Sequence, residues 1–389
     1  MAELDSKSFT VAEDSSVYYG GGYWNDLPVV ADFIERRATG KEATPWYVHL
    51  KEVTGGRTFK KGLFLNCGNG WVERELLRAG IVEETVGIDI SEDLLDNARK
   101  AAADEGLNAR YFARDINTAD LPEDGYDLVV NYAAAHHMAY LDKVLRRVAE
   151  LLPEDGVFAS VDYIGPHRNQ YPYEQWQAAS DLNDTLPEAY RADLPYPHLP
   201  TMLHGDPTEA IHSELIEQLV RRYFALEEFK PIGGGLAYVV LSFNKGIHDN
   251  PGPERDALVQ RVLDADVAWT DEHGPLFAFF WGRPDKAVLA QADQLAAWSR
   301  EEEERERAAA ANGGQYYPLT VLQQLTQQRE TLRVQNGHMM ADLHAQGRPE
   351  PGGEPAAPSL RWVAVTTLDA KAPAVAKVLR KARTKLKAR

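Results

Sequence analysis

The sequence predicts an α/β fold, a doubly wound sheet of seven strands that carries helices on both faces. Short apolar runs alternate with helix-like patterns from about residue 62 to residue 245. Such alternation requires crossover connections between parallel strands. Hydrophobic residues make up 44% of the chain and charged residues 26%, so the chain can bury a substantial core. Its 389 residues also leave room for more than one domain.

The expected elements follow one another in a regular order. Strands are expected at residues 63–65, 86–88, 110–112, 126–131 and 156–163, and helices at 72–79, 91–104 and 140–152. Ser91 is well suited to cap the second of these helices. The pattern resumes with a helix over 211–223 and two closing strands, 224–231 and 236–243, joined by three glycines. Ligands of such sheets bind beyond the carboxyl ends of the strands, where the strand order reverses.

Two segments outside this alternation are expected to shape a site. Residues 1–60 form a helical leader or lid, in which Pro28 suits a first helical turn. Its aromatic, glycine-rich stretch 18–24 would either pack on the domain or close over a ligand. Residues 165–207 interrupt the domain 61–250 and are rich in proline and aromatic residues. A connection of this length usually covers or shapes a site, so we expect an inserted loop that lies over a ligand site.

A helical C-terminal extension is expected to follow the sheet domain. Residues 251–311 are expected to be mostly helical, and 316–345 form a candidate coiled coil because 318–343 fit a heptad repeat. The alternative is a single helix that lies on its own domain. A Pro/Gly linker over 346–359 then leads to a basic amphipathic tail over 360–389. The tail suits an anionic membrane surface, although a solvated tail fits the same composition.

Charge is unevenly placed along the chain. The formal net charge is −17, but residues 370–389 contain eight Lys or Arg and no acid, which leaves −25 on the remainder. A body this acidic argues against nucleic acid as a partner. The sequence shows no secretory signal and no apolar run of about 18 residues, and Cys67, its single cysteine, cannot form an internal disulfide. We therefore expect a cytoplasmic protein whose tail could dock it peripherally at the inner face of the membrane.

A glycine-containing turn after the first strand is the main candidate for ligand binding. Gly68 and Gly70 let the backbone approach a ligand closely, and the following helix offers unpaired amide donors. Asp89 ends the second strand, where a carboxylate can accept both hydroxyls of a ribose, and Asp115 follows the third strand, where an acid can bind an adenine amino group. The predicted nucleotide site comprises Asn66, Cys67, Gly68, Gly70, Asp89, Ile90, Asp115, Ile116 and Asn131.

Two classes of nucleotide site compete for this turn. A dinucleotide enzyme needs G-x-G-x-x-G, whereas Trp71, Val72 and Glu73 follow Gly70 here. The run Leu65-Asn66-Cys67-Gly68-Asn69-Gly70 instead resembles class I S-adenosylmethionine-dependent methyltransferases, whose loop reads L-x-C-G-x-G. Residues 126–131 and 151–158 are similar to that family's fourth- and fifth-strand motifs. The resemblance implies a Rossmann-like fold and S-adenosyl-L-methionine as the cofactor.

A closer resemblance covers roughly residues 18–245. Residues 23–24, 37–40, 68–74, 162–170 and 206–210 are similar to a bacterial methyltransferase group associated with surface-polysaccharide and other glycan biosynthesis. This implies O-methylation of a sugar hydroxyl on a glycan or glycolipid intermediate. The chain departs from the class I pattern at Phe64, where most members have an acid, and at Asn66, where most have glycine. Because that acid meets the methionine ammonium, Glu73 and Asn131 are candidates to replace it.

Acceptor chemistry is expected where the fourth strand ends. Removing a hydroxyl proton needs a nearby base, and His136 or His137 is available near neutral pH, although either could instead cap the next helix. Asp162 ends the fifth strand, where a second base or a metal ligand could stand. Some sugar methyltransferases use a divalent ion held by carboxylates and histidines, so a metal stays open, but no ligand spacing demands one and no metal ligands are predicted. Residues expected to bind the acceptor are His167, Arg168, Gln170, Tyr173 and Trp176.

Two other functions fit the same sequence. One is a methyltransferase acting on a small natural product, for which we expect a closed pocket rather than a wide groove lined by Trp176 and Tyr196. The other is a non-catalytic scaffold that self-associates through residues 318–343 and docks on a membrane.

Overall fold

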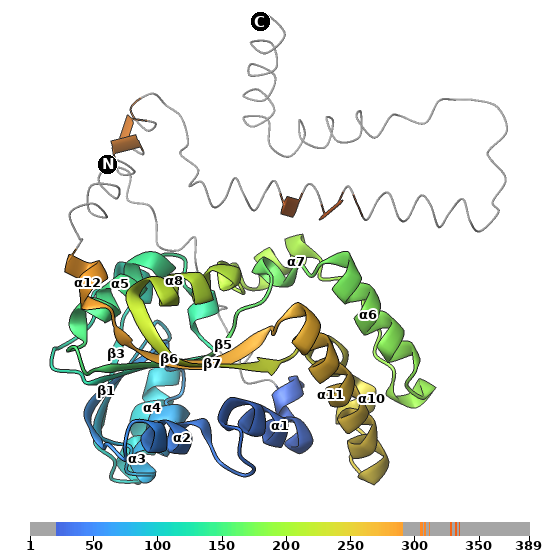
Figure 1. The fold of residues 1–389 in the computed structure, drawn as a ribbon, viewed down its shortest axis with the longest axis horizontal. Helices are drawn as coiled ribbons and strands as arrows, with labels where there is room; N and C mark the ends of the chain where they lie inside the picture. The colour runs from blue at the N-terminus through green and yellow to red at the C-terminus, as the bar shows by residue number, and fades with distance from the viewer. Residues whose placement is uncertain are drawn as a thin grey trace, which may run out of the picture. The chain divides into compact units, whose positions relative to one another are not determined.

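The central sheet has seven strands in the order β3-β2-β1-β4-β5-β7-β6 (Figure 1). The computed structural model describes residues 21–290 and isolated residues between 304 and 334, and all elements given below belong to one compact unit. The strands are β1 (Phe59–Leu65), β2 (Val82–Asp89), β3 (Ala109–Ala113), β4 (Leu128–Tyr132), β5 (Val157–Tyr163), β6 (Phe224–Gly233) and β7 (Phe277–Pro284). Strands β1 to β5 pair in parallel, and β7 runs antiparallel to both of its neighbours. The predicted doubly wound α/β fold is thus confirmed.

The reversal of strand order lies between β1 and β4. Leu65, at the end of β1, is in register with Ile88 on one side and Asn131 on the other. The loops that follow β1, β2 and β4 therefore leave the sheet at the same edge. Parallel strands at such a reversal create the crevice in which ligands of these folds bind.

Helices cover both faces of the sheet (Figure 1). One face carries α5 (Leu141–Leu151), α8 (Ile216–Tyr223) and α12 (Lys286–Ala290); the other carries α1 (Pro28–Thr39), α2 (Trp46–Val53), α3 (Trp71–Arg78), α4 (Glu92–Asp104) and α11 (Pro253–His273). The buried apolar residues accordingly form separate clusters, a large one that includes Phe33, Leu50 and Leu263 and another that includes Leu145 and Val220. The sheet is thus buried from both sides, as its long apolar strands require.

Strand β7, the last strand of this sheet along the chain, lies in a segment that was expected to be mostly helical. We expected residues 236–243 to pair with 224–231, but they form the short helix α9 (Ala237–Leu241), and β6 pairs with β7 instead. A short apolar run does not by itself distinguish a buried strand from a buried helix. The boundary at residue 250 is therefore wrong, because α11 and β7, placed in the extension 251–311, complete the sheet domain.

The inserted segment 165–207 is largely helical. It contains η6 (His167–Asn169), α6 (Tyr173–Asp184), η7 (Glu188–Tyr190) and α7 (Leu199–Gly205), and η8 (Ser213–Leu215) leads on to α8. The remaining short elements are η3 (Trp24–Asp26), η4 (Ile116–Thr118), η5 (Ala135–His137) and α10 (Lys245–His248). Apart from isolated positions, the predicted coiled coil 316–345 lies outside the described residues, as do the linker 346–359 and the tail 360–389. Within the described part of the chain, no helix is both long and apolar enough to cross a membrane.

Candidate active site

The turn after β1 has an unusual backbone. Asn66, Gly68 and Gly70 all lie in the left-handed region, with φ of 46°, 56° and 69°. Asparagine adopts this conformation more readily than other side-chain-bearing residues do. The position where the class I pattern has glycine is therefore filled by the residue type that best tolerates the same backbone.

Asp89 ties this turn to the end of β2. Its carboxylate accepts hydrogen bonds from the amide of Gly68 at 2.8 Å and from the amide of Ser91 at 2.8 Å. Burial raises the pKa of Asp89, while these amides act in the opposite direction. On the next loop Asp115 accepts a hydrogen bond from the Asn117 amide at 2.9 Å. The two acids predicted to bind a nucleoside are thus held in place by the backbone of their own loops.

One cavity of about 840 Å³ connects this turn to the end of β4. Nine predicted site residues line it. Seven lie at the end near the turn, Asn66, Cys67, Gly68, Asp89, Ile90, Asp115 and Ile116, and His136 and His137 lie at the other end. The volume lies within the range of small-molecule and cofactor sites, roughly 300–1,000 Å³. The sheet therefore brings most of the predicted nucleotide site and both histidines into one space.

The cofactor end of this cavity fits an adenosyl compound. Asp89 and Asp115 supply acceptors, the turn supplies closely approachable backbone, and Ile90, Ile116 and Leu94 supply apolar walls. Ile90 is half-exposed, as expected of a side chain that covers a ligand. An apolar cavity with a few convergent polar groups is the usual setting of such ligands.

Gly70 and Asn131 do not line the cavity. Gly70 supports the turn from beneath, because a Cβ there would lie 2.5 Å from the hydroxyl of Tyr111. Asn131 is buried and donates hydrogen bonds from Nδ2 to Ser160 and Asp162 at 2.8 and 2.6 Å. Both residues therefore lie behind the cavity wall, where Gly70 leaves room for Tyr111 and Asn131 holds Ser160 and Asp162.

Glu73 is fully buried below the turn. A Cβ on Gly87 would lie 2.5 Å from Oε1 of Glu73 and 2.7 Å from Sγ of Cys67, so the carboxylate fills the space that Gly87 leaves. Within the described part of the chain, neither carboxylate oxygen has a partner at hydrogen-bonding distance and angle, and the polar group beside it is the Cys67 thiol. Burial raises the pKa of Glu73 to about 8 and also raises that of the Cys67 thiol. Glu73 is thus mostly neutral near pH 7, and its role toward a methionine ammonium stays a prediction. Phe64, where most class I members have an acid, is buried and lines the cavity.

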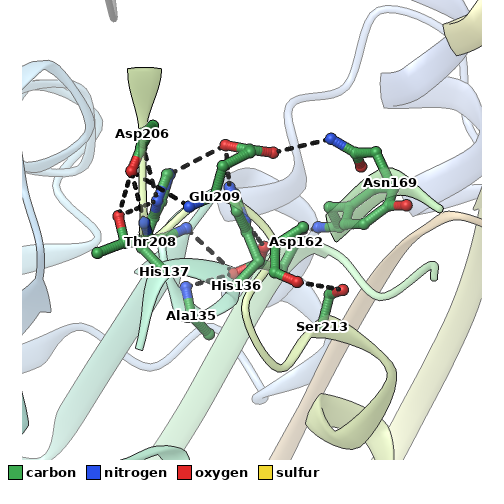
Figure 2. A network of polar contacts seen from close by, with 12 residues as sticks. Ala135, His136, His137, Asp162, Asn169, Asp206, Thr208, Glu209 and Ser213 are labelled. Atoms are coloured by element: carbon green, nitrogen blue, oxygen red, sulfur yellow. Dashed lines mark hydrogen bonds and ion pairs between the residues drawn. The ribbon is translucent and has the colours of Figure 1, made fainter. Parts of the chain in front are cut away.

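At the acceptor end, His136 is held by a buried aspartate (Figure 2). Nδ1 of His136 lies 2.5 Å from Oδ1 of Asp162, whose Oδ2 accepts the amides of Ala134 and Ala135 at 3.1 and 2.7 Å. Burial would lower the pKa of His136, but the Asp162 carboxylate outweighs it and raises the pKa to about 9. Burial would raise the pKa of Asp162, and its charged and hydrogen-bonding partners lower it. Asp162 therefore orients His136 from behind and does not itself line the cavity.

The hydrogen bonds around His137 determine which of its two ring nitrogens carries the proton. Thr208 Oγ1 lies 2.6 Å from Oδ1 of Asp206 and 3.0 Å from Nδ1 of His137. A carboxylate only accepts, so the single hydroxyl proton of Thr208 goes to Asp206. Nδ1 of His137 must then be the donor to Thr208, which leaves the lone pair on Nε2. Burial and the neighbouring His136 both lower the pKa of His137.

Glu209 contacts both histidines, although it is not among the site residues predicted from the sequence. Its Oε2 lies 3.7 Å from Nε2 of His137 and 4.0 Å from Nε2 of His136, while its Oε1 accepts a hydrogen bond from Asn169 at 3.2 Å (Figure 2). The signal that could have revealed it is its position in the motif 206–210, one of those that carried the resemblance.

The residues predicted to bind an acceptor serve other contacts in this structure. Arg168 donates hydrogen bonds to the backbone oxygens of Pro207 and Glu209, and Gln170 donates to those of Arg168 and Pro197. Trp176 packs between Tyr171 and Tyr196. The residues predicted to bind an acceptor are His167, Arg168, Gln170, Tyr173 and Trp176, and none of them lines the cavity. The first of them, His167, pairs with Glu214 at 3.2 Å. Their role in acceptor binding stays a prediction.

Aromatic side chains from distant parts of the chain surround the acceptor end instead. Trp24 is buried against Phe277 and Tyr238, with ring centroids 5.2 and 6.2 Å apart, and all three line the cavity together with Tyr163. The stretch 18–24 therefore reaches the cavity through its last residues. Phe277 was missed because β7 was expected to be helix.

Comparisons with known proteins agree with the class of site. A family described as a methyltransferase domain matches residues 63–156. An uncharacterized methyltransferase of Bacillus subtilis, YcgJ, is 30% identical over 103 residues, 26% of this chain and 41% of that protein. A ubiquinone biosynthesis O-methyltransferase of Coxiella burnetii is 26% identical over 111 residues, 28% of this chain and 47% of that protein. The chain thus spans less than half the length of these relatives.

Among solved structures, an S-adenosylmethionine-dependent methyltransferase from Clostridium acetobutylicum is 23% identical, with a TM-score of 0.29 over 36% of this chain and 55% of that one. A likeness of this size carries no functional conclusion. The family match agrees with the strand order and the turn: residues 63–156 are similar to a methyltransferase domain, and S-adenosylmethionine is the cofactor that such a domain implies.

Proposed function

We propose that the protein transfers a methyl group from S-adenosylmethionine to a hydroxyl of a sugar in a glycan or glycolipid intermediate. The observation that supports this most directly is that one continuous cavity is lined by Gly68 and Asp89 at one end and by His136, His137 and Glu209 at the other. Cofactor and acceptor can therefore meet in one space, which buried aromatic rings line at the acceptor end.

The chain's own residues would do two things in this reaction. When bound, S-adenosylmethionine supplies a methyl group on a positively charged sulfur. Asp89 and the turn hold the adenosyl part, so that the acceptor oxygen is positioned in line with the methyl carbon. His136 is held protonated by Asp162, so the base is His137: its Nε2 keeps a lone pair at the acceptor end, where it can take the hydroxyl proton as the C–O bond forms and the C–S bond breaks.

The sugar acceptor is supported by the motif resemblance and by the aromatic walls of the cavity. Trp24, Tyr163, Tyr238 and Phe277 offer flat apolar faces beside the polar groups, an arrangement that suits a sugar ring with its apolar and hydroxyl-bearing sides. A second candidate is a small hydroxylated natural product. It is favoured by the packing of Trp176 against Tyr196, at 5.2 Å between ring centroids, because these rings do not line an open groove.

Two measurements test the proposal. Calorimetry with S-adenosylmethionine should show binding, and Asp89→Ala should weaken it by about tenfold or more, since the substitution removes both the ribose acceptor and the support of the Gly68 amide. Labelled methyl transfer into separated glycan, lipid and small-molecule extracts then identifies the acceptor. Absence of cofactor binding by the unsubstituted protein would favour the non-catalytic scaffold. Label confined to small molecules would overturn the glycan acceptor.

We further propose that the C-terminal segments place this enzyme in the cell. Residues 318–343 would associate with a second copy, and the basic tail 360–389 would bind an anionic membrane surface at its cytoplasmic face. The heptad repeat and the charge of the tail support this. Such placement would bring the catalytic domain close to lipid-linked acceptors.

A further inference from the structure

A cluster of three metal-ligating side chains lies at the acceptor end of the cavity. Ligand atoms of His136, His137 and Glu209 all lie within 4.8 Å of one another. We propose that this cluster binds a divalent first-row transition ion of the zinc class. The inference rests on the proposed function in one respect, that the ion would hold an oxygen of the acceptor.

The spacing of the cluster suits a shared ion. Oε2 of Glu209 lies 3.7 Å from Nε2 of His137 and 4.0 Å from Nε2 of His136. Ligands at roughly 2.0–2.1 Å from a tetrahedral ion lie about 3.3 Å apart, so small side-chain rotations close the difference. Two consecutive residues of η5 supply both imidazoles, and the ring centroids are 4.3 Å apart.

Each ligand is already oriented by a neighbour on its far side. Asp162 holds Nδ1 of His136, Thr208 accepts from Nδ1 of His137, and Asn169 holds Oε1 of Glu209. The remaining atoms, two Nε2 and one Oε2, converge (Figure 2). Histidines that bind metals usually donate their other ring N–H in this way, because that hydrogen bond fixes the tautomer and the ring orientation.

The donor set also identifies the kind of ion and its use. Two imidazoles with one carboxylate suit zinc and related first-row ions better than magnesium or calcium, which prefer oxygen ligands. Three protein ligands leave at least one position open, and all three of these residues line the cavity. An acceptor hydroxyl could therefore bind the ion directly and be held beside the methyl donor. With the ion bound, the histidine Nε2 atoms would no longer be free to take the proton, and the ion would instead lower the pKa of the hydroxyl that it holds.

A second histidine–carboxylate pair serves as a control. His167 lies 3.2 Å from Glu214, yet its ring neighbours are His212 and the Arg168 guanidinium, and it is not part of any three-ligand group among the described residues. Because the chain has 11 histidines, a control of this kind separates the proposed site from adventitious binding elsewhere.

The test is titration of the full-length, tag-free, chelator-treated protein with Co²⁺, followed by its visible absorption. We expect saturation near one equivalent and competition by Zn²⁺. Glu209→Gln and His137→Ala should each weaken binding by about tenfold or more, whereas Glu214→Gln should not. Circular dichroism checks that every variant is folded; His136→Ala is avoided because it would leave Asp162 buried without its partner.

Saturable binding that is lost in the first two variants and kept in the third supports the site. Absence of saturable binding, or equal affinity in Glu209→Gln, His137→Ala and the unsubstituted protein, overturns it. Cofactor calorimetry on the same samples separates this result from the proposed function. If Co²⁺ binds and S-adenosylmethionine does not, the metal site stands and the methyltransferase activity fails.

Discussion

At the scale of single residues, the departures from the class I pattern have local physical explanations. Asn66 occupies a left-handed position that the class fills with glycine, and Phe64 is buried where most members have an acid. Glu73, in the helix that follows the turn, is buried, and among the described residues its carboxylate has no hydrogen-bond partner. A neutral Glu73 costs less to bury than an ionised one, so its protonation is coupled to folding.

This coupling predicts how stability changes with pH. The pKa of Glu73 is about 8 in the folded protein against 4.5 for the free group. Below pH 4.5 the carboxyl is neutral in both states and does not lower the free energy of unfolding. Between pH 4.5 and about pH 8 it ionises in the unfolded chain but not in the folded one, so the free energy of unfolding falls. The shift corresponds to at most about 5 kcal/mol. Glu73→Gln should therefore unfold with a higher free energy than the unsubstituted protein at pH 8 and with a similar one near pH 5, as measured by urea denaturation.

The matched control is Glu83→Gln, because Glu83 is exposed on β2. This variant should follow the pH dependence of the unsubstituted protein. An advantage of Glu73→Gln that is the same at pH 5 and pH 8 would contradict the coupling.

At the scale of elements, the contact between α11 and α9 shows why the domain extends past residue 250. Asp266 of α11 is fully buried and accepts the amides of Gly234, Leu236 and Ala237 at 2.7, 2.7 and 2.9 Å. These are the unpaired donors at the start of α9, so a residue from α11 completes this helix. Burial raises the pKa of Asp266, and the amides oppose that rise.

Replacing this cap should destabilise the whole domain. Asp266→Ala would leave three buried amides without partners, and we expect a loss of about 3–5 kcal/mol in the free energy of unfolding. The control is Asp264→Ala on the same helix, because Asp264 is exposed and bonds only to Gln260 among the described contacts. Equal midpoints of thermal unfolding for the two variants would show that α11 is an appendage and not part of the domain.

At the scale of the whole molecule, charge separates the body from the tail. Eight Lys or Arg and no acid lie beyond residue 370, while the rest of the chain is strongly acidic. Attraction to an anionic membrane should therefore depend on the tail alone and be screened by salt.

Deletion of residues 347–389 tests this directly. The shortened protein should no longer sediment with anionic vesicles, while its affinity for S-adenosylmethionine should be unchanged. Binding of the full chain should fall steeply as salt is raised, and neutral vesicles serve as the control. Vesicle binding that survives the deletion would contradict the role of the tail.

Much of the site could be predicted because its parts follow successive strands. The turn 66–70, Asp89, Asp115 and the histidines 136–137 each come directly after a strand, and parallel strands bring such residues to one edge. Glu209 and Phe277 could not be found in this way, because Glu209 lies on the connection that follows the insertion 165–207 and Phe277 lies on an antiparallel strand. The residues in the insertion that were predicted to bind the acceptor do have polar and aromatic side chains. Arg168, Gln170 and Trp176 use them for hydrogen bonds and ring contacts that stabilise this segment.

The amino-acid sequence alone determined the alternation of strands and helices, the nucleotide turn and its acids, because these depend on local periodicity and on residues with special backbone preferences. Only the tertiary structure decided which segment completes the sheet and which side chains converge with His136 and His137. Those outcomes depend on contacts between residues far apart in the chain, for which local patterns carry no signal. The partner of β6 was decided by packing in this way, and so was the meeting of Glu209 with two histidines more than seventy residues before it.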